Sequence, residues 1–224
     1  MPDFASRDEY EQRLARALSR LGRQLTTEIM ERLGSPPDSS RLDAAFWDDV
    51  RKRYSNILLG DLEQVYIEAA RGMEDVEGVP PTDEALLNEA AVTWASAHVE
   101  RLVSQIDSTN QRGVQRAVDQ YFRQGTGNVD LLEQRVSNVF NVGRAGNTAI
   151  TEVTNAVSNG EQSIVRQLRS AGVTMVAVFN TANDDRVCAI CEPLDQTKQG
   201  EDWMTPPPLH TGCRCWLSYE VERA

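Results

Sequence analysis

The chain has 224 residues, and its hydrophobic content of 40% is that of an ordinary folded protein rather than of a disordered chain. Its 34 acidic and 23 basic residues give a formal net charge of −11, so no general electrostatic attraction to DNA is expected. The sequence predicts neither a membrane span nor a signal peptide, because no run of about 20 apolar residues occurs and residues 1–11 are polar. We therefore expect a soluble protein that is made and kept in the cytoplasm, with no membrane partner.

The charge is spread unevenly along the chain. Residues 61–107 hold eleven acids against two bases, a net of −9, whereas residues 108–171 hold five acids against seven bases, a net of +2. Any contact with nucleic acid would therefore be local, and the opening segment is the candidate for it through Arg7, Arg13, Arg16, Arg20 and Arg23. Four glutamates share that segment, so a solvated helix of mixed charge is the simpler interpretation.

Three long amphipathic helices are predicted in the first half of the chain. Residues 8–33 place apolar side chains on one helical face, and Gly34 and the prolines after it end the helix. A second helix begins near Asp43 and fades into the glycine- and proline-marked stretch at 72–81, and a third covers residues 82–106. Such helices must pack on each other or on a neighbouring subunit, which also allows a homo-oligomer.

From residue 110 to 172 the pattern predicts shorter helices, interrupted at 125–128 and again at Asn159-Gly160, with Gly172 placed as a helix C-cap. The apolar period then changes. Residues 173–179 are rich in β-branched side chains and predict a buried strand. Residues 216–221 alternate in polarity and predict its antiparallel partner.

The fold class that follows is mainly α. We expect a helical region over residues 1–138, and a small α+β module with a β-hairpin over residues 139–224. Within that module, residues 172–222 hold the two strands and every cysteine of the chain. On the second strand, Leu217, Tyr219 and Val221 are expected to share one face.

All four cysteines and one of the two histidines fall within 28 residues, in the pattern C-x2-C-x18-H-x2-C-x-C. The members are Cys188, Cys191, His210, Cys213 and Cys215. A C-x2-C turn brings two thiolates to one ion, and a second pair of ligands from a distant hairpin arm completes a tetrahedron, which is typical of a structural zinc site. The spacing therefore predicts zinc held by Cys188, Cys191, His210 and either Cys213 or Cys215, with the choice between the last two left open.

Two other states of the cysteines are alternatives to zinc. Disulfides are disfavoured because the cytoplasm keeps thiols reduced, and because Cys213 and Cys215 lie too near each other for a bridge to stabilise much. Free thiols are the remaining state. The intervening loop, residues 192–209, is poor in apolar side chains and cannot build a core of its own, so a metal could supply stability on the order of ten kcal/mol.

A catalytic zinc ion would need an open coordination position and a nearby base, whereas this ligand set is rich in thiolates and already oversupplied. The zinc-containing HNH-type nucleases need further histidines at the reaction centre, and here only His98 remains. His98 lies on the apolar stripe of the third helix, which favours a hydrogen-bonded core or interface residue. We therefore do not expect an enzyme.

The C-terminal part resembles the phage Mu F-like head morphogenesis or minor capsid proteins, over about residues 139–217. The resemblance is carried by Asn180-Thr181, by residues 184–188 (DDRVC) with Cys191, by the proline run before Leu209-His210, and by Cys213-Arg214-Cys215. Residues 144–155 (RAGNTAITEVTN) look like the family's helix with the pattern R-x-x-x-I-A-R-T-E, from which this chain departs by lacking the second arginine.

The resemblance implies a structural minor protein of a tailed-phage head, located in the virion and acting in head assembly, DNA packaging or delivery. It implies contacts with the portal protein and with major capsid or scaffold proteins, and packaged DNA is a further candidate partner. Its zinc ion would be an element of the fold. Asp185 and Arg186 are carried over as motif residues only, either as a buried salt bridge at the C-x2-C turn or as plain loop surface. The competing hypothesis is a zinc-dependent nucleic-acid-binding protein or nuclease carried in the virion.

Overall fold

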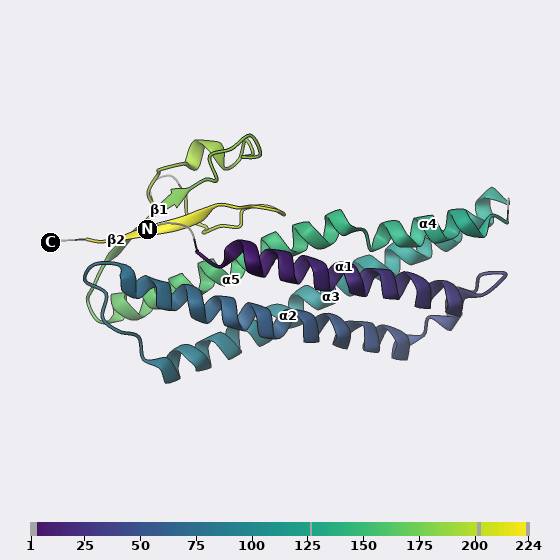
Figure 1. The fold of residues 1–224 in the computed structure, drawn as a ribbon, viewed down its shortest axis with the longest axis horizontal. Coiled ribbons are helices and arrows are strands. Elements are labelled where there is room, and N and C mark those ends of the chain that lie inside the picture. The colour runs from purple at the N-terminus through teal and green to yellow at the C-terminus, as the bar shows by residue number, and fades with distance from the viewer. Residues whose placement is uncertain (1–3, 126, 201–202, 223–224) are drawn as a thin grey trace.

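The computed structural model describes residues 4–125, 127–200 and 203–222. Its long helices run side by side in an elongated bundle, and a two-stranded sheet lies at one end, near both chain termini (Figure 1). The helices are α1 (Arg7–Leu33), α2 (Ala44–Gly72), α3 (Glu84–Gln124), α4 (Val129–Val139) and α5 (Val142–Ser170), with short 3-10 turns η1 (Ser39–Arg41), η2 (Met73–Asp75) and η3 (Glu192–Leu194). The strands are β1 (Met175–Asn180) and β2 (Trp216–Val221). The predicted fold class is confirmed.

Four of the helices begin at a side chain that accepts a hydrogen bond from the first turn. The capping residues are Asp43 for α2, Asp83 for α3, Asn128 for α4 and Asn141 for α5. Each cap satisfies a backbone N–H that has no partner inside its helix, which explains why the helices start at these residues. None of the described helices is both long enough and apolar enough to cross a membrane.

Two helices are longer than the sequence predicts. The third predicted helix does not end near residue 106, because α3 continues to Gln124 and stops only at Gly125, which adopts a left-handed backbone conformation. The predicted interruption at Asn159-Gly160 is wrong, since α5 runs unbroken through both residues.

Gly160 allows a close contact between two helices and does not interrupt α5. A Cβ atom at this position would lie 2.3 Å from the backbone carbonyl oxygen of Tyr66 on α2. Only a residue without a side chain allows the two backbones to approach so closely. The glycine therefore marks the point where α2 and α5 cross.

The strands pair antiparallel from Met175 with Val221 to Asn180 with Trp216. The first strand begins two residues later than predicted, because the chain leaves α5 through Gly172, whose φ of +85° lies in the left-handed region. Leu217 and Tyr219 are buried and Val221 is half-buried, so the predicted common face of β2 is confirmed.

The sheet has no core of its own but shares one with the bundle. Phe179 and Leu217 are fully buried, and they belong to the same apolar cluster as Met73 of η2 and Leu168 of α5. A second cluster fills the length of the bundle between α1, α2, α3, α4 and α5. The predicted division between residues 138 and 139 falls within α4, just before its last residue, and as a domain boundary it stays a prediction.

His98 has a structural role, as the sequence predicts. Its Nε2 atom lies 2.6 Å from a carboxylate oxygen of the buried Glu152 on α5, and its ring stacks on Trp94 with centroids 4.9 Å apart. It is therefore a hydrogen-bonded residue of the packing between α3 and α5.

We predict that Gly160→Ala lowers the free energy of unfolding by about 1–3 kcal/mol, because the new methyl group forces α2 and α5 apart. Gly146→Ala is the matched control on the same helix, since a Cβ there meets nothing within 4 Å. The control should be neutral or stabilising by about 0.5–1 kcal/mol. Chemical denaturation of the two variants checks this, and equal stabilities would contradict the assigned helix crossing.

Candidate metal centre

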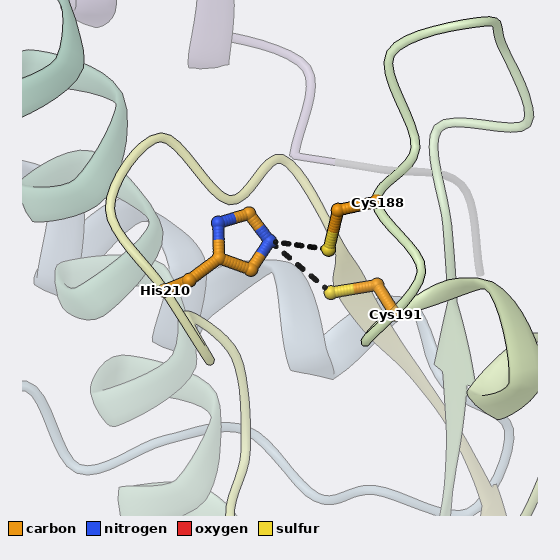
Figure 2. A group of neighbouring side chains, drawn as sticks. All are labelled: Cys188, Cys191 and His210. Carbon is orange, nitrogen blue, oxygen red and sulfur yellow. Dashed lines mark hydrogen bonds between the residues drawn. The ribbon is translucent and has the colours of Figure 1, made fainter.

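The five predicted ligands come from two arms of the segment between β1 and β2. Cys188 and Cys191 lie on a turn closed by the Cys191 N–H, which donates to the Cys188 carbonyl at 3.0 Å. His210, Cys213 and Cys215 lie on the arm that leads into β2. Figure 2 shows the His210 ring from one arm facing the sulfur atoms of Cys188 and Cys191 from the other. The structure thus brings together the residues that the sequence pattern selected.

The segment between the two arms is hydrogen-bonded to β1. Residues 196–199 pair with the edge of β1 opposite to β2, through bonds such as Gln196 N–H to the Phe179 carbonyl at 2.7 Å and Phe179 N–H to the Thr197 carbonyl at 2.9 Å. Trp203 then packs edge-on against Phe179 and is buried. The loop predicted to lack a core therefore contributes one tryptophan to the core it shares with the helices.

The donor atoms form two overlapping groups. Cys188, Cys191 and His210 make one, and Cys191, Cys213 and Cys215 make the other, with all ligand atoms of a group within 4.8 Å of one another. His210 Nε2 lies 3.0 Å from the Cys188 sulfur and 3.4 Å from the Cys191 sulfur. The Cys191 and Cys213 sulfurs are 3.8 Å apart. Cys191 is therefore the central member of the cluster.

These distances fit a tetrahedral ion. Zinc bonds of about 2.3 Å to sulfur and 2.0–2.1 Å to nitrogen place two tetrahedral sulfurs about 3.8 Å apart, and a sulfur and a nitrogen about 3.6 Å apart. The spacing of Cys191 from Cys213 and from His210 agrees with that geometry, while Cys188 must move outward by a few tenths of an ångström. The donor set and its spacing thus fit zinc, and they fit other ions that prefer thiolates.

The histidine is oriented for metal binding by its backbone. Its Nδ1 atom lies 2.9 Å from the Thr211 carbonyl oxygen. Because a carbonyl only accepts hydrogen bonds, Nδ1 carries a proton, and the lone pair of neutral imidazole is then on Nε2, which faces the thiols. The Thr211 bond is also the largest of the effects that raise the pKa of His210.

The four thiols of the cluster have their pKa values shifted in different directions. The Cys215 thiol donates to Cys213, and with backbone N–H groups it lowers the pKa of Cys213 to about 5. Burial raises the pKa of Cys191 to about 12, and the adjacent Cys213 thiolate, together with burial, raises that of Cys215. Burial also raises the pKa of Cys188, but bonds from the backbone N–H groups of Cys191 and Ile190 outweigh it and the net shift is downward. A cation in the cluster would replace the protons that keep these thiols together.

The second arm is hydrogen-bonded to α5 at two points. Thr151 accepts a bond from the Gly212 N–H at 2.8 Å, and Thr154 donates to the Cys213 carbonyl at 2.9 Å. Thr154 also accepts a bond from the buried Arg7 of α1 at 2.8 Å. The sequence pattern gave no signal for these two threonines beyond their place in the helix that resembles the family motif.

An ion pair joins the two arms, but not the one the sequence suggested. Asp184 accepts two bonds from Arg214, at 2.6 and 2.8 Å, and this guanidinium is the main cause that lowers the pKa of Asp184 to about 2. Asp185 and Arg186 are both exposed, so the suggestion of a buried salt bridge between them is wrong and the loop-surface alternative holds. Arg186 reaches Asp184 only at 3.5 Å.

Compared with known proteins, the chain matches no family model, no curated protein and no solved structure.

We predict that Thr154→Val destabilises the protein by about 1–3 kcal/mol, because it leaves the Cys213 carbonyl and the buried Arg7 each without one partner. Hydrogen exchange of the backbone at residues 210–215 should accelerate. Thr27→Val is the matched control, since the Thr27 hydroxyl is exposed and bonds only within α1. Unchanged exchange at residues 210–215 would show that α5 does not hold the arm.

Proposed function

We propose that Cys188, Cys191, His210 and one of Cys213 and Cys215 hold a structural zinc ion that locks the two arms of the C-terminal segment together. The observation that carries the proposal is the overlap, at Cys191, of two groups of three donor atoms that come from two separate chain segments. Cys191, Cys213 and Cys215 are buried, which suits a closed coordination shell.

A structural role is better supported than a catalytic one. A catalytic ion needs an open position and a general base, whereas four thiols and a histidine more than fill a tetrahedron. Asp184, the carboxylate that lies against the second arm, is bonded to Arg214 and is not placed to take a proton. The ion would therefore stabilise the fold.

We further propose that the protein is a minor head protein of a tailed phage, located in the virion, that binds the portal or neighbouring shell and scaffold proteins. Support comes from the resemblance of residues 139–217 and from the surface of the bundle. Large apolar side chains are exposed on the bundle: Phe122, near the C-terminal end of α3, is 56% exposed, and Val142, the first residue of α5, is 66% exposed. Such residues suit contacts with another protein.

A second candidate is a zinc-dependent nucleic-acid-binding protein or nuclease. Hollows lined by arginine on α3 and α4 favour a nucleic-acid contact in this otherwise acidic chain. The two candidates differ in whether an action on DNA depends on the metal. Only the second requires that binding or cleavage of DNA be lost when the metal is removed.

We predict about one zinc ion per chain in protein purified without chelator, measured by elemental analysis. Cys188→Ser should lose the metal, and chelation should accelerate hydrogen exchange at residues 181–215 while the helical circular dichroism is retained. Cys213→Ser and Cys215→Ser identify the fourth ligand, because only one of them should lose the metal. Purified protein with no bound metal would refute the zinc proposal.

We also predict that the protein is captured by the portal protein of the same phage. Phe122→Ser combined with Val142→Ser should weaken capture by at least about tenfold, since two apolar side chains that the partner would cover are lost. Met204→Ser is the control, because Met204 is 77% exposed but lies in the loop beside the sheet. Equal capture of both variants would show that Phe122 and Val142 do not lie on the contact surface.

A further inference from the structure

Four arginines gather where α4 and α5 meet beside α3. Arg112 and Arg116 lie one turn apart on α3, Arg135 lies on the facing side of α4, and Arg144 lies in the first turn of α5. They line adjoining hollows that share Thr109 and Arg116, and the hollow between α3 and α4 has a volume of about 390 Å³. We call this surface the arginine groove, and its lining also includes Thr109 and Asn138.

The groove is free of negative charge. No carboxylate lines either hollow, nor a third hollow that continues past Arg112 towards α2. In the part of the chain that the structure describes, none of the four arginines pairs with a carboxylate. By contrast, Arg13, Arg53 and Arg71 elsewhere on the bundle each pair with an acid. The groove is therefore a local site of positive potential on a protein of net charge −11.

Hydrogen bonds within the protein orient the guanidinium groups and leave some of their N–H donors for a ligand. Arg112 and Arg116 each bond a carbonyl oxygen of their own helix through Nε, at 3.1 and 3.2 Å, which leaves their Nη groups for a ligand. Arg135 bonds the side chain of Gln124 at 2.8 Å. Arg144 donates from Nη1 to Asn110 and to the Val139 carbonyl, at 2.7 and 2.8 Å. The site is thus oriented before any ligand arrives, which lowers the entropy that binding costs.

The lining favours phosphate over a protein surface. Several forked guanidinium groups beside amide and hydroxyl donors suit the repeated oxygens of a phosphodiester chain. Between the arginines no large apolar side chain is exposed, since Val139 is half-buried and Ala117 is buried. A protein partner would normally need an apolar anchor at the centre of its contact.

A larger hollow provides a contrast. Its volume is about 690 Å³, and it lies beside β2. Among the described residues, its lining includes Glu68, Asp75, Glu77, Glu161 and Glu220 and no basic side chain. Phosphate would be repelled there, so a nucleic acid approaching the molecule would be directed to the arginine groove.

We propose that the arginine groove binds the phosphodiester backbone of a nucleic acid, independently of base sequence and of the metal centre. This inference goes beyond the proposed zinc and assembly roles and does not require either. It also places the nucleic-acid contact on α3, α4 and α5 rather than on the arginines of α1 that the sequence pointed to.

The test measures fluorescence anisotropy of a labelled duplex DNA of random sequence with the full-length protein. If all four arginines contact phosphates, affinity should fall about fifty-fold between about 50 and 150 mM monovalent salt. For Arg112→Gln combined with Arg116→Gln, the fall should be only about seven-fold, because two contacts remain. Glutamine keeps the helix propensity of α3, and circular dichroism confirms that the variant is folded.

Arg20→Gln combined with Arg23→Gln is the matched control, since both are exposed arginines on α1 and the change in net charge is the same. The control should retain the salt dependence of the original protein. Single-stranded DNA of equal length should also bind, with a weaker salt dependence of about 0.7 rather than 0.9 per phosphate contact.

Binding that persists in chelator and is lost in the groove variant supports the proposal. It is overturned if the groove and control variants bind alike, if no binding occurs at about 50 mM salt, or if polyglutamate displaces DNA as well as unlabelled DNA does. Loss of binding in chelator would also overturn it and would favour the metal-dependent candidate. Metal content and portal capture are measured separately, so failure here leaves the proposed function standing.

Discussion

The apolar core shared by the sheet and the helices is the contact on which the C-terminal segment depends. A two-stranded hairpin is at best marginally stable in water, and here Phe179 and Leu217 are fully buried in one apolar cluster with Met73 and Leu168 of the bundle. Once the strands are seated, the arms between them are held from three directions. The edge of β1 pairs with residues 196–199, α5 bonds the second arm, and the cysteine and histidine cluster joins the arms to each other.

Helix faces, the strand pair and the metal cluster were predictable because each leaves a periodic or compositional pattern in the sequence. The unbroken course of α5 was not, since a glycine gives the same signal whether it ends a helix or admits a neighbouring backbone, and only the contact with Tyr66 separates the two. The suggested salt bridge of Asp185 and Arg186 was wrong in both partners, because loops have no period to show that Asp184 faces Arg214 from the other arm. The fourth ligand stayed open because both Cys213 and Cys215 reach Cys191.

Net charge describes the molecule poorly, because its acids and bases occupy different places. Residues 61–107 are strongly acidic, and several of their carboxylates line the large hollow beside β2. Arg112, Arg116, Arg135 and Arg144 lie instead where α3, α4 and α5 meet. A chain that would be dismissed as a nucleic-acid partner on its total charge therefore carries a local surface suited to phosphate.

The shared core also sets an order of events during synthesis. The helices that pack beneath the two strands leave the ribosome before the strands do, and β1 leaves before β2, which carries Leu217. The strands therefore pair on a helical surface that has already been synthesised. Binding of the proposed metal ion would then follow the folding of the helices rather than start it.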